Sequence, residues 1–360
     1  VVTWFEGSGV QNTRLNGVDQ PRVNQVRGAQ NTGLSIGARS DGADPANARI
    51  MCLVVGDSSL TVDQAGKIED CFETSLAFTL GTSTIRLPLD YSALYSLTPK
   101  MAISTRKLLA AAPSNCIRVR RSSDNSEQNI GYTGNALNTS ALATFIGAGS
   151  GYITTMFGQV DADATQTIVT RQPSIALGGV INTIGSSPSA LFDGTSVLSH
   201  GASTAAWNQT TMPFYSMSVV DNDETTDGGI WVYSLGPAGT SGGPSVLVNG
   251  TGYQVRGGVT PNKETTPAGD RALPSVLSAR RTATDLTLRQ NGKQISSVAL
   301  GTSTIVTNTS GMLVGKFANS GASDGYKGKI AEVIVFKDAT VSSTVRKHLE
   351  ASARNAFGLE

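Results

Sequence analysis

The densest group of acidic side chains in this chain lies in one short polar stretch. Asp221, Asp223, Glu224 and Asp227 stand between two apolar runs that suit β-strands. A glycosidase needs two carboxyl groups about 5 to 10 Å apart, whereas Ca²⁺ takes several oxygens from one flexible loop. A loop between strands is also commonly just solvated. No catalytic residue is assigned here. Calcium, held by Asp221, Asp223 and Asp227, is the one cofactor that the sequence suggests.

A second charged group lies on a predicted strand. Arg118, Arg120 and Arg121 are followed closely by Asp124 and Glu127. Guanidinium groups offer several N–H donors to a carboxylate or a sugar, so Arg118 and Arg120 are glycan-binding candidates. Ion pairing along an exposed strand edge explains the same residues equally well.

Aromatic side chains are the third kind of candidate, because an aromatic face can cover a pyranose ring. Trp231 alternates with Ile230 and Val232, which favours core packing for its ring. The aromatic residues that remain as glycan-binding candidates are Trp207, Tyr215, Tyr233 and Tyr253.

Histidine and cysteine offer little chemistry. His200 and His348 are the only histidines, so neither a His-based triad nor a metal triplet can be assembled. Cys52, Cys71 and Cys116 are too few and too scattered for a zinc site or a disulfide framework, and buried free thiols are expected. Cys52 and Cys71 fall on a predicted strand and on the helix that follows it.

Composition excludes several classes of partner. The formal charge is +1 and charged residues make up 15% of the chain, so no global field attracts nucleic acid or anionic lipid. No apolar run approaches the ~18 residues of a membrane span. With 39% hydrophobic residues and 40 glycines, many short apolar runs between turn residues predict an all-β globular protein.

The elements that position these residues are indicated by an internal repeat. Residues 49–81 and 329–359 both contain an apolar run that suits a strand, then a polar turn, then a helical pattern. The apolar stripes of the two predicted helices match at a constant offset, which pairs Ile68, Phe72, Leu76 and Leu80 with Val345, Leu349, Ala353 and Phe357.

Glycine and asparagine positions extend this repeat. Gly81 and Gly358 stand just past the last apolar residue of each predicted helix, where a glycine can take the left-handed conformation that ends it. Asn16-Gly17 matches Asn291-Gly292, and Asn-Gly between apolar runs is a strong hairpin signal.

The most distinctive motif in the chain lies within residues 115–153. Residues 117–131 are IRVRRSSDNSEQNIG, whose alternation predicts a half-buried strand, and residues 140–147 suit a short helix. This run resembles the segment that leads into the catalytic domain of fungal-type arabinofuranosidase B and that recurs ahead of lectin-like domains in phage virion and bacterial surface proteins. The Tyr-Asp-Gln-Ser-Gly motif usual in those relatives is replaced by residues 157–161, FGQVD.

The predicted strands that follow resemble, in their order, the concanavalin A-like, laminin-G-like jelly roll. Residues 190–194, ALFDG, resemble its opening strand, and residues 276–292 resemble its strand-turn-strand hairpin. Residues 214–220 and 229–234 resemble its central strands, and residues 326–359 its closing strand and helix. The resemblance implies an all-β fold of tandem jelly-roll (β-sandwich) modules, each closed by a short C-terminal helix. This fold hosts lectins, hydrolases and structural parts alike.

The expected organisation is two modules of unequal completeness. Residues 1–82 form a partial or truncated module and residues 83–100 a linker. Residues 101–360 form a complete lectin-like module, whose part 101–185 resembles arabinofuranosidase B and begins with a helix over 101–112. Because half a sandwich leaves an apolar sheet face uncovered, we expect either a natural chain that begins before Val1 or a cover from the second module or a neighbouring subunit.

These features lead to one functional hypothesis and one alternative. The hypothesis is a non-enzymatic structural virion component, such as a phage fibre, spike, tail or capsid-decorating protein. Its lectin-like domains would mediate assembly with other virion proteins or with copies of itself and bind a host surface glycan. The expected location is the virion surface or the extracellular space. The alternative is a glycoside hydrolase acting on arabinose-containing polysaccharide.

Overall fold

The computed structural model divides the chain into two compact units, Val1–Thr82 and Ser83–Glu360. In the first unit it describes residues 2–5, 10–15, 18–19 and 23–24. In the second it describes residues 99–359 except 110–111, 161, 202–212, 223–227, 234–243, 251, 258, 261–263, 301–303, 306–311, 317–324 and 338–340.

The described part of the first unit is a four-stranded antiparallel sheet. Its strands are β1 (Val2–Phe5), β2 (Val10–Leu15), β3 (Val18–Asp19) and β4 (Val23–Asn24), and β2 pairs with the other three. Leu15 pairs with Val18, on either side of the predicted Asn16-Gly17 turn. That turn itself, the predicted strand and helix of residues 49–81, and Cys52 and Cys71 lie outside the described residues.

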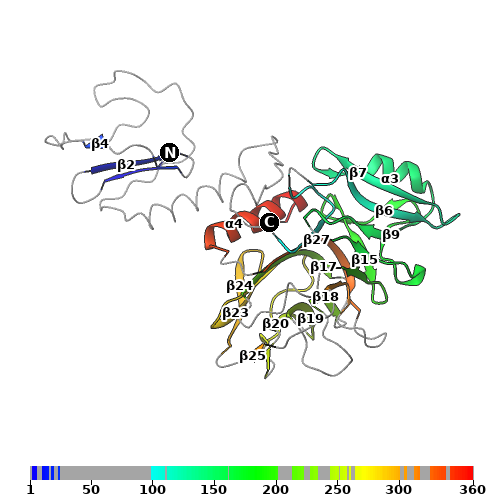
Figure 1. Cartoon of the computed structure of the whole chain (residues 1–360). Helices are drawn as coiled ribbons and strands as arrows, with labels where there is room; N and C mark the ends of the chain where they lie inside the picture. The colour runs from blue at the N-terminus through cyan, green and yellow to red at the C-terminus, as the bar shows by residue number, and fades with distance from the viewer. Residues whose placement is uncertain are drawn as a thin grey trace, which may run out of the picture. The chain divides into compact units, whose positions relative to one another are not determined.

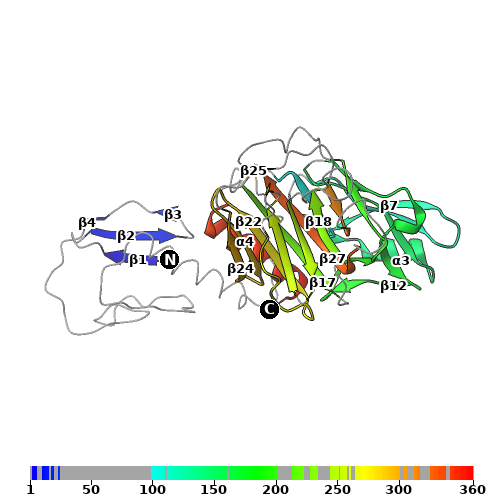
Figure 2. The same cartoon turned by 90° about the horizontal axis from the view of Figure 1, so that it is seen from below.

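The second unit is a β-sandwich with a C-terminal helix, which confirms the predicted fold class. Its first sheet has the order β24 (Lys293–Ala299), β23 (Asp285–Gln290), β22 (Ser275–Arg281), β17 (Phe214–Asn222) and β27 (Lys327–Lys337). The far edge of β27 pairs with β5 (Met101–Ser104) and β15 (Ala190–Asp193). Figure 2 shows β22, β17 and β27 running side by side.

The second sheet is built from shorter strands. It has the order β20 (Gly252–Gly257), β19 (Pro244–Asn249), β18 (Gly228–Tyr233), β26 (Met312–Val314), β16 (Leu198–His200), β10 (Ala164–Thr165), β9 (Gly151–Met156), β6 (Asn115–Arg121), β7 (Glu127–Thr133) and β8 (Ala136–Leu137). The two sheets join through β11 (Ser174–Leu177), which pairs with β12 (Val180–Ile181), β9 and β15.

The remaining elements are small. Two further pairs of short strands are β13 (Thr183–Ile184) with β14 (Ser187–Pro188) and β21 (Val259–Thr260) with β25 (Thr304–Ile305). The helical elements of the described second unit are α3 (Thr139–Ile146), α4 (Ser343–Phe357) and the short 3₁₀ segment η1 (Val169–Arg171). Within the described residues, no helix combines the length and the apolar character needed to cross a bilayer.

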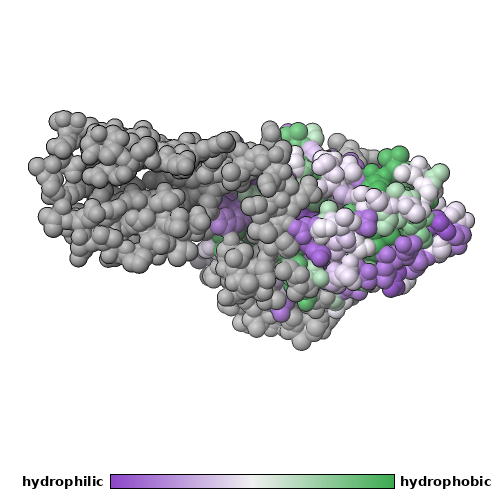
Figure 3. Space-filling model, turned by 90° about the horizontal axis from the view of Figure 1, so that it is seen from above, coloured by the Kyte–Doolittle hydropathy of each residue, from purple (hydrophilic) through white to green (hydrophobic). Residues whose placement is uncertain are grey.

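Two apolar layers hold the unit together. Figure 1 shows α4, drawn in red, beside the strands of the second unit. The larger fills the space between the sheets, with Leu277 and Leu288 from the first and Val246 and Val255 from the second. The smaller lies between the first sheet and α4, and includes the predicted helix stripe of Val345, Leu349, Ala353 and Phe357. Side chains alternate between the two layers along β17, as period two requires. On the face drawn in Figure 3, hydrophilic and hydrophobic residues are interspersed over the described surface.

The closing helix and the second hairpin form as predicted. The Ser342 side chain accepts a hydrogen bond from Val345 N at 3.2 Å, and Gly358 ends α4 with φ of 64°. Gln290 pairs with Lys293, and Asn291 and Gly292 between them have φ of 50° and 84°. Two consecutive positive φ angles define the tight hairpin turn that Asn-Gly favours.

The helix predicted over residues 101–112 is wrong. Met101 and Ile103 do not share a helical face, because they belong to the strand β5 and pack between the sheets, whereas Ala102 packs toward α4. Met101 pairs with Val335 and Ile103 with Val333 on the open edge of β27. Strand pairing and burial on both faces therefore override a weak local preference for helix.

Candidate functional site

The arginines predicted on the strand of residues 117–121 lie on β6, and each one contacts a ring. Arg118 is exposed, donates to Asn129 Oδ1 at 2.8 Å and lies 5.9 Å from the Phe157 ring centroid. Arg120 is only 7% exposed and lies 4.9 Å from the Tyr152 ring centroid. These contacts give both candidates partners inside the fold.

Arg120 and Arg121 also donate hydrogen bonds to neighbouring side chains. Arg120 donates to Gln172 Oε1 at 2.7 Å and to Asn125 Oδ1 at 2.8 Å. Arg121 forms two hydrogen bonds with the Asp124 carboxylate, at 3.1 and 2.7 Å, and these lower the pKa of Asp124 below its usual range. Arg121 and Asp124 form the ion pair of this cluster, and Arg120 is held by neutral side chains. Glycan binding by Arg118 and Arg120 stays a prediction.

The aromatic candidates separate by burial. Tyr215 and Tyr253 are both 0% exposed, so neither ring offers a face on which a sugar at the surface could stack, and this expectation needs correction. Tyr253 on β20 packs between the two sheets, and Tyr215 on β17 lies between the first sheet and α4. Tyr233 is the last residue of β18. The side chains of Tyr233 and Trp231, and the whole of Trp207, lie outside the described residues.

The acidic loop is described only at its beginning. Asp221 Oδ2 lies 2.9 Å from Lys329 Nζ, so this carboxylate has a cationic partner from the neighbouring strand β27. Asp223, Glu224 and Asp227 lie outside the described residues, and calcium at this loop stays a prediction. Within the part of the chain that the structure describes, no cluster of three or more His, Cys, Asp or Glu side chains suits a metal ion.

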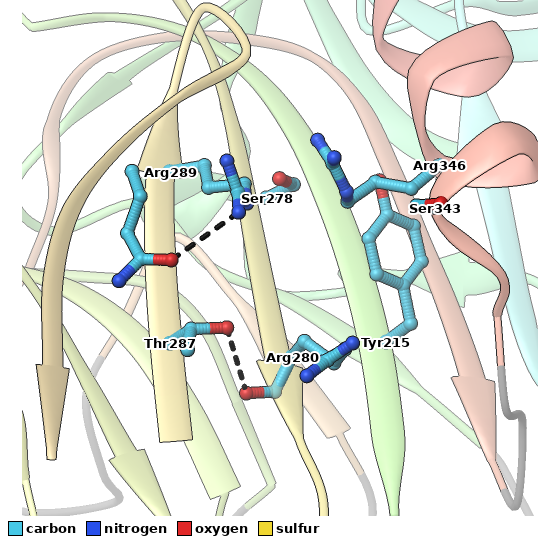
Figure 4. A pocket seen from close by; sticks show the side chains of 8 residues that line it. Tyr215, Ser278, Arg280, Thr287, Arg289, Ser343 and Arg346 are labelled. Atoms are coloured by element: carbon cyan, nitrogen blue, oxygen red, sulfur yellow. Dashed lines mark hydrogen bonds between the residues drawn. The ribbon is translucent and has the colours of Figure 1, made fainter. Parts of the chain in front are cut away.

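A cavity of about 100 Å³ lies between the first sheet and α4 (Figure 4). We call it the arginine pocket, because the guanidinium groups of Arg280, Arg289 and Arg346 line it, on β22, β23 and α4. The ring of Tyr215 on β17 forms one wall in Figure 4. The other lining residues are Ser278, Thr287, Gln294 and Ser343.

The hairpin register explains why these side chains meet. Ser278 pairs with Arg289 and Arg280 with Thr287 across β22 and β23. The residues between them pack into the core on the other face of the sheet, so the four polar side chains share the face toward α4. Arg346 reaches the same space from the first turns of α4, where the helix covers this sheet face.

Each guanidinium of the pocket has a different set of partners. Arg346 Nη1 lies 2.9 Å from Glu350 Oε2, and Ser278 donates to the other oxygen of that carboxylate. Arg280 Nη2 lies 3.6 Å from Asp285 Oδ1. Arg289 donates to the Gly292 carbonyl at 3.1 Å and to Gln294 Oε1 at 3.2 Å. Arg289 is therefore held by neutral oxygens.

The charges of the pocket act on one another. Burial lowers the pKa of the Arg289 guanidinium, the positive charges of Arg346 and Arg280 lower it further, and Glu350 opposes this. A group of like charges that is partly desolvated in this way offers N–H donors and a positive potential to an anion.

A second, shallower hollow lies beside α3, and we call it the α3 hollow. Its volume is about 660 Å³, and it is lined by Arg121, Gln128, Asn138, Ser140, Ala141, Thr144 and Phe145. Asn138 Oδ1 accepts from Ala141 N at 3.0 Å and so begins the helix. The ring of Phe145 is fixed by Arg121, whose guanidinium carbon lies 5.0 Å from the ring centroid. Amides, hydroxyls and an aromatic ring thus share one open surface without a carboxylate.

Most described carboxylates already have partners. Apart from Glu127, every carboxylate whose side chain the structure describes takes part in an intramolecular hydrogen bond or ion pair: Asp124, Asp163, Asp193, Asp221, Glu264, Asp270, Asp285, Glu332 and Glu350. The described part of the chain therefore offers no second unengaged carboxyl group to complete a pair with Glu127.

Sequence reasoning missed both sites. In the arginine pocket, the alternation of Ser278 and Arg280 with apolar residues, repeated by Thr287 and Arg289 across a predicted turn, was the available signal. It predicts a polar sheet face, but the cover that turns this face into a cavity is α4, more than fifty residues further along the chain. In the α3 hollow, Gln128 and Thr144 come together only through the packing of α3 on β7.

Comparison with known proteins gives a fold and no family. No protein-family model matches the chain, and no curated protein sequence matches it. Among solved structures, a family 54 α-L-arabinofuranosidase soaked with a cyclic sulfate inhibitor matches with a TM-score of 0.55 and 14% identity over 75% of this chain. An arabinofuranosidase complexed with arabinofuranosyl-α-1,2-xylobiose matches with a TM-score of 0.54, also at 14% identity and 75% coverage.

This likeness has a limited extent. This chain spans 65% of the length of either arabinofuranosidase. Domain 4 of an extracellular family 43 arabinanase from Geobacillus stearothermophilus, in complex with arabinotriose, gives a TM-score of 0.35 at 12% identity, covering 46% of this chain and 80% of that domain. At these identities the likeness to the arabinofuranosidases shows a shared fold.

Proposed function

We propose that this protein is a non-enzymatic structural component of a virion or a comparable extracellular assembly, and that its β-sandwich unit binds a surface glycan. The observation that carries the binding role is the α3 hollow. It combines the Phe145 ring with the amides of Gln128 and Asn138 and the hydroxyls of Ser140 and Thr144. Such groups bind sugar hydroxyls and C–H faces.

Two further observations support a binding role without cleavage. The α3 hollow contains no carboxylate, and general acid-base hydrolysis of a glycosidic bond uses two. The described carboxylates elsewhere, except Glu127, already serve the fold. A neutral saccharide suits the hollow, because its one lining cation, Arg121, is neutralised by Asp124.

The virion part of the proposal is supported by sequence. Residues 117–131 resemble a segment found ahead of lectin-like domains in phage virion proteins, and the unit that follows them is a β-sandwich. Mass spectrometry of purified particles from the source of this chain tests the location, because we expect the protein in the particle fraction. Sedimentation of the purified protein tests the expected assembly with copies of itself, and a monomer at all concentrations would contradict that part.

The binding role is tested with matched phenylalanine variants. Neutral arabinoxylan oligosaccharides are titrated into wild type, Phe145→Ala and Phe157→Ala. Both rings are half-buried and lie near an arginine, at 5.0 and 5.9 Å, but only Phe145 lines the hollow. We expect Phe145→Ala to weaken binding about two- to tenfold and Phe157→Ala to leave it unchanged, because an aromatic ring contact is worth roughly 0.5 to 1.5 kcal/mol. Equal effects would contradict the assigned site.

The alternative function is a glycoside hydrolase acting on arabinose-containing polysaccharide. The likeness of fold to the arabinofuranosidases, with a TM-score of 0.55, is the observation that favours it. Incubation with 4-nitrophenyl α-L-arabinofuranoside and with arabinoxylan separates the two functions. We expect no release of arabinose, and turnover that a single carboxylate-to-amide change abolishes would replace the binding proposal with this one.

A further inference from the structure

The arginine pocket lies on different elements from the α3 hollow and has the opposite chemistry. Its lining comes from β17, β22, β23, β24 and α4, whereas the hollow is lined from β6, β7 and α3 with its N-cap. Three guanidinium groups from three elements converge on a cavity of about 100 Å³. Liquid water occupies roughly 30 Å³ per molecule, so the cavity has room for a small polyatomic group.

The charges within the pocket do not cancel. Arg346 is paired with Glu350, and Arg280 lies at a looser 3.6 Å from Asp285. Two carboxylates thus face three cations. The third cation, Arg289, donates to a carbonyl and an amide oxygen among the described residues. One positive charge of the pocket is left without a counter-charge in the described part of the chain.

The arrangement also leaves a hydrogen-bond donor unused on a residue of the pocket lining. Arg280 Nε–H is buried and has no hydrogen-bond partner among the described residues. Burial and the neighbouring arginine charges lower the pKa of Arg289. A desolvated cation held against like charges is unfavourable by itself, and an anion with several acceptor oxygens relieves that cost.

We propose that the arginine pocket binds the carboxylate group of a small polar ligand, such as an acidic sugar. A carboxylate carries the single negative charge that the pocket lacks. Its two oxygens match the paired N–H donors of a guanidinium group. Ser278, Thr287, Gln294 and Ser343 at the wall supply hydroxyl and amide groups for polar substituents next to that carboxylate.

The position of the pocket adds to this preference. Ser343 and Arg346 belong to the first turns of α4, where backbone N–H groups give the helix end a partial positive charge. The bound carboxylate would bridge α4 and the β22–β23 hairpin. Ligand binding is therefore expected to raise the melting temperature, because a ligand that binds only the folded state stabilises it.

The test is a titration of the full chain with D-glucuronate and with D-glucose at low salt, followed by calorimetry and thermal melting. These probes differ only in the carboxylate. We expect glucuronate to bind and to raise the melting temperature, glucose to do neither, and the affinity for glucuronate to fall as NaCl screens the charges. Equal behaviour of the two probes would overturn the proposal, and tighter binding of inorganic phosphate than of glucuronate would overturn the choice of a carboxylate.

Variants assign the binding to the pocket. Arg289→Gln removes the positive charge that has no counter-ion. Arg289→Lys keeps this charge but loses the paired N–H donors of the guanidinium group. Arg171→Gln removes an exposed arginine of η1, away from the pocket lining. We expect a loss of at least tenfold in affinity for Arg289→Gln, a smaller loss for Arg289→Lys, and no change for Arg171→Gln. Unchanged affinity in Arg289→Gln overturns the assignment.

A second variant tests the site if Arg289→Gln does not fold. Thr287→Val keeps the shape of a half-buried pocket residue and removes only its hydroxyl. If Arg289→Gln does not fold, a severalfold loss of glucuronate affinity in Thr287→Val supports the site and an unchanged affinity refutes it. Binding of the neutral arabinoxylan oligosaccharides serves as the internal control, because these changes leave the α3 hollow intact.

Discussion

The same residue type is used in two ways in two regions of the second unit. Just after β5 and on β6, two arginines are held by groups of the fold. Arg106 binds Glu332 through two nitrogens, at 2.7 and 3.0 Å, and Arg120 has two side-chain acceptors and the Tyr152 ring. In the arginine pocket, Arg289 donates to two neutral oxygens, and the like charges of Arg346 and Arg280 lie near it together with the Glu350 carboxylate.

This difference separates arginines that stabilise the fold from arginines that are available to a ligand. A guanidinium that is buried among acceptors and rings of the fold, without like charges beside it, contributes to folding, and its removal leaves a partner unsatisfied. A guanidinium held against like charges contributes little to folding. The stability of single variants tests this difference, from the largest expected effect to the smallest.

The largest effect is expected at the buried pair of Arg106 and Glu332. Arg106→Met leaves the Glu332 carboxylate, which is 0% exposed, without its cation, and breaking such a pair costs about 3–5 kcal/mol. Urea unfolding checks this value. The double variant Arg106→Met with Glu332→Leu should recover part of the loss, because no buried charge remains. A loss below about 1 kcal/mol for the single change would contradict the structural role.

A smaller loss is expected at Arg120. Arg120→Ala removes hydrogen bonds to Gln172 and Asn125 and the stacking on Tyr152, and the loss of a hydrogen bond to a charged group costs about 1.5–3 kcal/mol. The free energy of unfolding of the variant should fall by that amount. Arg118→Ala, on the exposed side of the same strand, is the control, and its free energy of unfolding should fall by less. A glycan-binding loss without a stability loss would return Arg120 to the ligand candidates.

Removing Arg289 should change stability little or in the opposite direction. Because the repulsion from Arg346 and Arg280 opposes the two hydrogen bonds that Arg289 makes, Arg289→Gln without ligand should stay within about 0.5 kcal/mol of wild type, the usual range for surface substitutions. Any gain should shrink as salt screens the repulsion. Chemical unfolding at two salt concentrations measures both quantities. A loss as large as that of Arg120→Ala would remove the distinction between the two regions.

The smallest effect is expected at the exposed pair of Arg121 and Asp124. Arg121 lowers the folded-state pKa of Asp124 from its ordinary value of 3.8. A carboxyl group with a lowered folded-state pKa adds stability above its unfolded-state pKa, and this contribution is lost as the pH falls through the folded-state value. An NMR titration should therefore show Asp124 still ionised at pH 3.8. In Arg121→Gln the pKa should return toward 3.8, and an unchanged pKa would exclude Arg121 as the cause.

The sequence by itself determined the elements whose signals are local. The α4 stripe, its Gly358 cap, the Asn291-Gly292 turn and the helix at residues 140–147 all depend on side chains close together in the chain. The alternation around Ile117 located β6. The order of such elements, together with the family resemblance, was enough for an all-β sandwich with a C-terminal helix.

Only the tertiary structure decided which side chains meet. Residues 101–104 form a strand because β27 offers an open edge more than two hundred residues away. Tyr215 and Tyr253 are buried because sheets and α4 cover them, and Arg280, Arg289 and Arg346 form a pocket because α4 returns over the β22–β23 hairpin. Burial and charge compensation depend on neighbours that are distant in sequence, so no local pattern encodes them.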